Sequence, residues 1–194
     1  MLSSIHPLGE RARHNRWGVT VSAFTVGAIA SGAALGLALG GIGWITLTLD
    51  SSILLIATAG LALAGGVLDL TGIEPPGPSR QVNENWIGAF RGWVYGGGFG
   101  IELGVGVATY IVTWTVYAML LSAFLTASPV AGALVGAAFG LGRSMSILSA
   151  RFVDRPSRLI SFNRALARGG PIVRWATPAV IIATGLVLVT RGLQ

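Results

Sequence analysis

Long apolar runs separated by short polar segments dominate the chain. Five such runs occur, over residues 17–49, 53–70, 92–127, 129–150 and 171–190. A transmembrane helix needs about 20 mostly apolar residues. The pattern therefore predicts an all-α, polytopic transmembrane helical bundle of about five spans. Residues 1–16 are expected to form a cytoplasmic tail, and residues 17–194 a single transmembrane domain.

Two of the runs, 17–49 and 92–127, are longer than one span requires. A continuous helix over the first would be about 50 Å long at ~1.5 Å per residue, against a hydrocarbon core of about 30 Å. Either the helices tilt strongly or they are broken or re-entrant within the protein. The candidate break points are two glycine pairs, at positions 41 and 43 and at positions 104 and 106.

The composition excludes most soluble functions. Hydrophobic residues make up 53% of the chain and charged residues 10%, whereas a soluble domain carries roughly 25% charge. The sequence contains no P-loop, HExxH or GxSxG motif and no cysteine, so thiol chemistry and thiolate metal sites are absent. We expect no enzymatic activity, no cofactor, no metal site and no nucleic-acid partner.

Every positive side chain is an arginine, and their distribution predicts the orientation. With five spans, twelve of the thirteen arginines lie on one face, and only Arg191 lies on the other. Positive residues concentrate on the cytoplasmic side of membrane proteins. We therefore expect a multi-pass protein of the plasma membrane with a cytoplasmic N-terminus, and the Arg-only, Ala/Gly-rich composition favours a bacterial source.

The segment 151–170 is expected to be a cytoplasmic amphipathic loop. Leu159, Phe162 and Leu166 recur at helical spacing, and residues 169–171 (Gly-Gly-Pro) are expected to end the helix. Such a helix lies on the membrane surface. The arginines of residues 151–174 would then bind anionic lipid headgroups, and docking of a soluble partner is the alternative.

Glycines spaced four residues apart form three ladders, which share a helix face because of that spacing. Such faces let helix backbones approach closely in a membrane, so the ladders predict tight helix packing. The ladder residues are Gly32, Gly36 and Gly40 in the first run, Gly96, Gly100 and Gly104 in the third, and Gly132, Gly136 and Gly140 in the fourth.

The chain also has the pattern of an internal two-helix repeat. A long run followed by a shorter one occurs twice, and the long runs open with similar residues, RWGV from Arg16 and RGWV from Arg91. Phe24 and Phe99 fall at matched positions. Repeats of this kind are typical of transporters with a site at the repeat interface.

These glycine and apolar patterns resemble the transmembrane domain of the CcdA and DsbD thiol–disulfide carriers, within the group that includes LysE-type and TauE/SafE-like exporters. The similar stretches are residues 16–42, 54–66, 99–106, 131–142 and 171–190. The chain departs from the family where its two cysteine-bearing sites would lie. It has only His6-Pro7 at the first and residues 103–106 (Leu-Gly-Val-Gly) at the second. The resemblance therefore implies a carrier-like helical scaffold without electron-transfer chemistry.

Glu102 and Arg143 are the charged residues within predicted spans that point most directly to function. A carboxylate near the bilayer centre costs a few kcal/mol unless it faces a partner or water. Glu102 is thus a candidate proton or cation site, or else a structural residue bonded to neighbouring hydroxyls. Arg143 could pair with a carboxylate or receive an anion, or extend to the headgroups.

Hydroxyl groups in the third run are candidates for lining a polar pathway with these charges; they belong to Thr109, Tyr110 and Thr113. Asp50 and Asp69 are expected to be boundary or cap residues. His6 and His14 are expected to lie in the solvated tail.

Two functions from different classes remain open. The first is a small membrane carrier for a solute or ion, with Glu102 as its polar centre. The second is a non-transporting membrane subunit or assembly factor that packs against a partner membrane protein or a second copy of the chain. A remnant redox carrier is disfavoured because the cysteines are missing.

Overall fold

The computed structural model describes residues 5–78, 85–108, 111 and 113–192. Most of these described residues are helical. No strand occurs among these residues. The helices are α1 (Pro7–Ala12), α2 (Trp17–Thr46), α3 (Ser51–Thr71), α4 (Trp86–Ala89), α5 (Gly92–Val105), α6 (Thr115–Leu125), α7 (Pro129–Met145), the 3₁₀-helix η1 (Ser146–Phe152) and α8 (Pro156–Gly192).

Three helical segments are long and apolar enough to cross a membrane. They are α2, α3 and the segment Pro129–Phe152, which joins α7 to η1. The apolar helical stretches Thr115–Leu125 and Trp175–Thr190 are shorter, at 10–17 residues. The fold is thus compatible with a membrane protein, and the five spans and the internal repeat stay predictions.

The two long apolar runs differ in their continuity. The first is one helix, α2, so of the two alternatives the continuous helix is observed, and Gly41 and Gly43 do not interrupt it. The third is broken: α5 ends at Val105, and Gly106 has a positive φ of 75°. That conformation is strained for residues with a side chain, which explains why the break falls at a glycine. The expected single span over 92–127 is therefore two shorter helices, α5 and α6.

The expected stop at residues 169–171 is also wrong. A single helix, α8, runs from Pro156 to Gly192, and the predicted surface helix is its first part. Glycine and proline end helices in water, where freed backbone groups can bond to solvent. Here the helix nevertheless continues into the apolar stretch Trp175–Thr190.

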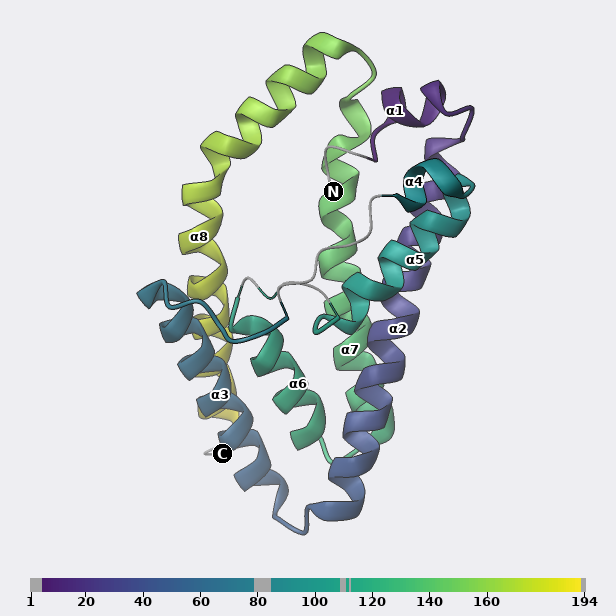
Figure 1. The fold of residues 1–194 in the computed structure, drawn as a ribbon. Coiled ribbons are helices and arrows are strands. Elements are labelled where there is room, and N and C mark those ends of the chain that lie inside the picture. Colours follow the sequence, from purple (N-terminus) through teal and green to yellow (C-terminus); the bar gives the residue numbers. More distant parts are fainter. Residues whose placement is uncertain (1–4, 79–84, 109–110, 112, 193–194) are drawn as a thin grey trace.

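Helix α2 packs against both α5 and α7, and α3 packs against α8 (Figure 1). Helix α6 contacts α2, α3 and α7 and so joins the two groups. Figure 1 also places α1, α4 and the turn between η1 and α8 at one end, while the turn between α2 and α3 lies at the other.

The glycine ladders lie in the contacts of α2, where side chains would not fit. A methyl group at Gly36 would overlap the carbonyl oxygen of Gly132 on α7, and one at Gly100 would overlap the carbonyl oxygen of Phe24. Close backbone approach of this kind maximises dispersion contact. The other ladder glycines meet backbone atoms in the same way: Gly32 meets Gly136, Gly40 meets Ser128, Gly96 meets Thr20, and both Gly104 and Gly140 meet Ala28.

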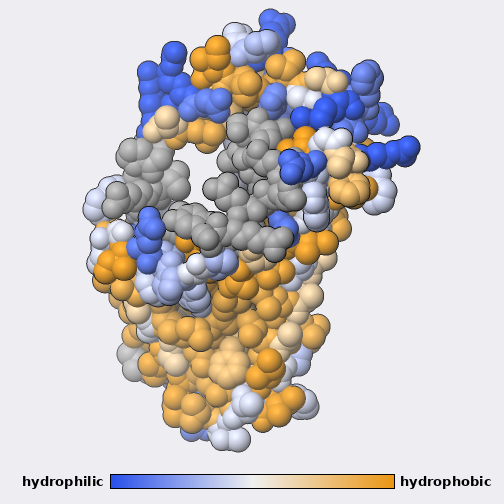
Figure 2. Space-filling view, in the orientation of Figure 1, coloured by the Kyte–Doolittle hydropathy of each residue, from blue (hydrophilic) through white to orange (hydrophobic). Residues whose placement is uncertain are grey.

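The molecular surface divides into a polar end and an apolar body. Hydrophilic residues gather at the end that carries α1 and the η1–α8 turn, and hydrophobic residues cover most of the rest (Figure 2). Large apolar side chains are exposed on this body, for example Ile45 at 76% and Val130 at 71%. An apolar surface of this extent is stable in lipid rather than in water.

Candidate functional site

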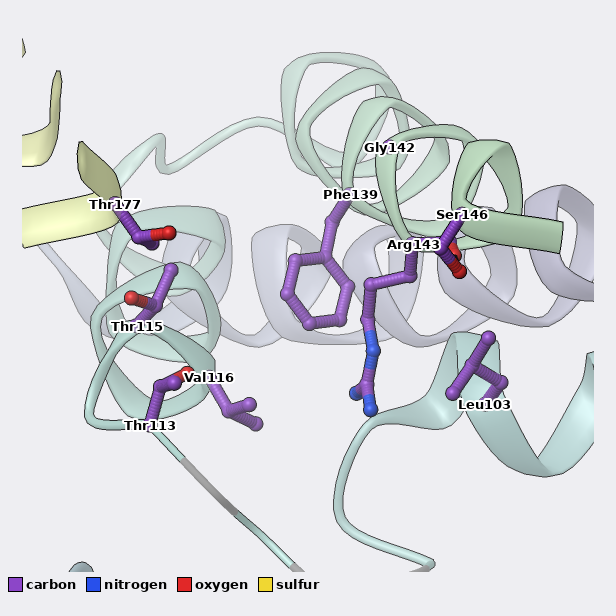
Figure 3. A pocket seen from close by; sticks show the side chains of 9 residues that line it. All are labelled: Leu103, Thr113, Thr115, Val116, Phe139, Gly142, Arg143, Ser146 and Thr177. Atoms are coloured by element: carbon purple, nitrogen blue, oxygen red, sulfur yellow. The ribbon is translucent and has the colours of Figure 1, made fainter. Parts of the chain in front are cut away.

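A candidate site is a pocket of about 720 Å³ between α5, α6, α7 and α8. Figure 3 shows Arg143 extending from α7 beside the Phe139 ring, with three threonines across the pocket. The pocket is lined by Leu103, Thr113, Thr115, Val116, Phe139, Gly142, Arg143, Ser146 and Thr177.

The break between α5 and α6 creates one wall of this pocket. A methyl group added at Gly106 would lie 3.2 Å from the Phe139 ring and 3.5 Å from Arg143 Nη1. The turn after α5 therefore passes directly beside the guanidinium. A continuous helix through this point would require a regular backbone at Gly106, so the break and the pocket depend on each other.

Arg143 is half-buried and incompletely bonded. Its guanidinium carbon lies 5.3 Å from the centroid of the Phe139 ring, a cation–π contact. Its Nη1 is buried and has no hydrogen-bond partner in the described part of the chain. An unsatisfied buried donor on a charged group is costly, and arginine does not lose its proton in proteins. The arrangement suits an anionic or strongly accepting ligand.

The hydroxyl groups around the pocket are not all available to a ligand. Ser146 donates to the Arg143 carbonyl oxygen at 2.8 Å, and Thr115 donates to Asp69 Oδ2 at 3.0 Å. A hydroxyl has one proton to donate, so these two can only accept from a ligand. Thr113 and Thr177 donate to no group among the described residues, and with Arg143 they supply the available donors.

Asp69 fixes the position of the pocket wall at the start of α6. Its Oδ1 accepts from the Trp114 backbone N–H at 2.7 Å, at the start of α6, while Oδ2 accepts from Thr115. Asp69 was expected to be a boundary or cap residue; it lies in the last turns of α3, whose C-cap residue is Gly72, and its carboxylate bonds to the start of α6 instead. Asp50 is the N-cap residue of α3 and makes no side-chain cap bond.

Glu102 lies on α5 next to Leu103 and is not among the described residues that line the pocket. It is half-buried, and its Oε2 is buried without a hydrogen-bond partner in the described ranges. The structure thus brings Arg143 and Thr113 to one pocket and leaves Glu102 outside that lining. Thr109 and Tyr110 lie outside the described residues.

A second polar cluster, which the sequence patterns did not reveal, joins the N-terminal segment to α2 and α5. Glu10 is fully buried and accepts hydrogen bonds from Arg13 at 2.6 Å, from Thr20 at 2.8 Å and from the Tyr95 hydroxyl. Residues 5–16 are therefore not a solvated tail. His6-Pro7 was the sequence signal that could have indicated a helix in this segment, because proline favours the first position of a helix.

His6 is likewise buried, at 8% exposure, so its expected solvation is wrong, whereas His14 is exposed. Its Nδ1 accepts from the Gly9 backbone N–H at 3.1 Å and caps α1. Burial lowers the pKa of His6 from 6.5, and nearby Arg13 lowers it further, while Glu10 partly opposes them. The pKa of Arg13 is raised: burial alone would lower it, but the hydrogen bond to Glu10 and the further interactions with Tyr95 and the Glu10 charge together outweigh this effect.

No family model, curated protein or solved structure matches the chain. The resemblance to the CcdA and DsbD carriers stays a prediction. The fold alone defines the class of protein. The described residues form helices and no strand, and three of the helical segments are long and apolar enough to cross a membrane, as in an integral membrane protein.

Proposed function

We propose that the protein is a membrane carrier that binds a small anionic solute beside Arg143. The observation that carries this proposal is the incompletely bonded guanidinium in a pocket of about 720 Å³. Ligand pockets commonly measure ~300–1,000 Å³. None of the described lining residues is acidic, so the charge in the pocket favours an anion.

The position of the pocket supports a carrier over a purely structural role. Non-helical backbone within a membrane is tolerated where it is enclosed by protein or lines a cavity, and broken helices in transporters supply substrate sites. The interruption after Val105 combines a break of this kind with a charged side chain. Helix packing alone does not require the interruption.

Glu102 is proposed as the coupling group of the carrier. Its buried Oε2 lacks a partner in the described part of the chain, and a carboxylate in an apolar region favours proton or cation binding. Because it is outside the described pocket lining, it would bind the coupling ion and not the anion.

Orientation follows from the polar end. The N-terminal helix α1 and the beginning of α8 lie there together with Arg11, Arg151 and Arg155. Under the positive-inside rule this end faces the cytoplasm, in a bacterial plasma membrane.

The test is the thermal stability of the detergent-purified protein in a panel of small anions, cations and amino acids at several pH values. A ligand at one hundred times its Kd stabilises the folded state by about 2.7 kcal/mol. We expect one class of anion to raise the Tm of the wild type and of Glu102→Gln, but not that of Arg143→Gln. Arg164→Gln, an exposed arginine on α8, is the matched charge control.

Transport is then measured in proteoliposomes with the anion identified in the panel. We expect uptake in the wild type, loss in Arg143→Gln, and loss of proton or cation dependence in Glu102→Gln. A panel without any Arg143-dependent shift would contradict the carrier. Co-purification of a membrane partner in that case would favour the alternative, a non-transporting subunit.

A further inference from the structure

A separate pocket of about 530 Å³ lies at the polar end, where α1 and η1 meet the first turn of α2. The backbone N–H of Leu8 bonds to the Val153 carbonyl oxygen at 3.2 Å and holds α1 against the end of η1. The pocket is lined by Pro7, Arg11, Asn15, Arg16, Trp17, Arg151 and Asp154.

The charge around this pocket is strongly positive. Arg11, Arg16 and Arg151 come from three different segments, and none of them forms an ion pair with another described residue. Asp154, the one acidic lining residue among those described, lies 3.0 Å from Arg158. This ion pair offsets part of its charge, although Asp154 Oδ1 is buried and accepts no hydrogen bond in the described part of the chain.

The first turn of α2 adds to this positive field. The positive end of a helix dipole is usually offset by an acidic residue or a side-chain cap. Here the N-cap residue is Arg16, which makes no cap bond, and the first turn contains no acidic residue. A long helix therefore begins beside three arginines without compensation from its own first turn.

Trp17, which is half-buried, provides an independent indication of a binding site. Its indole Nε1–H is buried and has no hydrogen-bond acceptor in the described part of the chain. Tryptophan Nε1–H is a donor only and usually finds a partner when buried. The pocket thus presents a buried indole N–H, three guanidinium groups and a helix N-terminus.

We infer that this pocket binds a phosphate group, with Arg16, Arg151 and Trp17 as its principal donors. Guanidinium groups bind phosphate through paired hydrogen bonds, and helix N-termini favour the same anion. The pocket lies at the polar end of the molecule, among α1, η1 and the beginning of α2. A phospholipid headgroup and free phosphate share the required chemistry. The site is independent of the Arg143 pocket and of the carrier proposal.

The test is native mass spectrometry of the detergent-purified protein with added phosphatidylglycerol or phosphatidylcholine. We expect retention of phosphatidylglycerol over phosphatidylcholine. The double variant Arg16→Gln/Arg151→Gln should lose about tenfold in phosphatidylglycerol binding, as expected for lost hydrogen bonds to a charged group. The control Arg155→Gln/Arg164→Gln removes the same charge from exposed positions outside the pocket lining and should change binding by less than twofold.

Two further arms make the result specific. Trp17→Phe removes only the Nε1–H donor and should weaken phosphatidylglycerol binding even where the double variant folds poorly. Inorganic phosphate is titrated at constant ionic strength: displacement of the lipid assigns the site to any phosphate group, and retention assigns it to lipid headgroups. Equal losses in both double variants, or equal binding of the two lipids, would overturn the inference.

Discussion

Buried polar residues decide how the N-terminal segment is attached. Glu10 has three hydrogen-bond donors around it, from α1, α2 and α5. Each of those donors loses its water on burial, so the carboxylate is needed for the segment to dock. A short polar stretch before the first span gave no sign of this in the sequence, because its partners Thr20 and Tyr95 are distant along the chain.

The lowered pKa of His6 makes docking of α1 dependent on pH. A group whose pKa is lower in the folded state contributes stability above its ordinary pKa, here 6.5, and loses it as the pH falls through the folded value. Protonation also removes the Nδ1 lone pair that accepts from Gly9. We expect the protection factors of the α1 amides, which correct exchange for its intrinsic slowing at lower pH, to fall as the pH falls from about 7 to 5.

His6→Asn should abolish this pH dependence and keep the helix cap, because asparagine is a preferred N-cap residue. His14→Asn, at the exposed histidine, should leave it unchanged. Equal protection factors of the α1 amides at both pH values in the wild type would contradict the role of His6.

Sequence spacing predicted the helices better than it predicted their partners. The apolar runs located α2 and α3 to within a few residues, and the glycines at 104 and 106 marked the break after α5. A spacing of four places glycines on one face without specifying which helix covers it. The pairing of Gly36 with Gly132, and the pocket beside Arg143, depend on the three-dimensional arrangement.

Two glycines in different surroundings, Gly36 on α2 and Gly60 on α3, predict different responses to an added methyl group. Gly36→Ala would overlap the Gly132 carbonyl oxygen, a backbone atom that cannot move aside alone. We expect a loss of about 1–3 kcal/mol in the free energy of unfolding, measured by denaturant titration in detergent.

Gly60→Ala is the matched control on α3. A methyl group there would have nothing within 4 Å, and alanine has a helix propensity about 1 kcal/mol better than glycine. We expect it to be neutral or stabilising. Similar losses in the two variants would show that general helix effects, and not the contact with α7, set the cost.

On the scale of the whole molecule, the polar end and the apolar body predict a topology that can be mapped directly. The chain contains no cysteine, so single cysteines can be introduced at exposed positions without removing native ones. Ser157 lies near the polar end and Ser52 near the opposite turn, and Thr190 is near the end of α8.

We expect Ser52→Cys and Thr190→Cys to react with a membrane-impermeant maleimide in intact cells, because both positions should face outward. Ser157→Cys should react only in inverted vesicles. Labelling of Ser157→Cys and Thr190→Cys from the same side would contradict the crossing of α8 and reduce the number of spans.

The backbone contacts of α2 also have a mechanical meaning. Glycine faces leave no long side chains to rearrange between α2, α5 and α7, so we expect these three helices to move as one body. The Arg143 pocket takes its remaining wall from α6, which joins the two groups of helices, and from α8, which belongs to the second group. For the proposed carrier we therefore expect the route to the anion to open when α6 and α8 move relative to α2, α5 and α7, with Gly106 as the hinge.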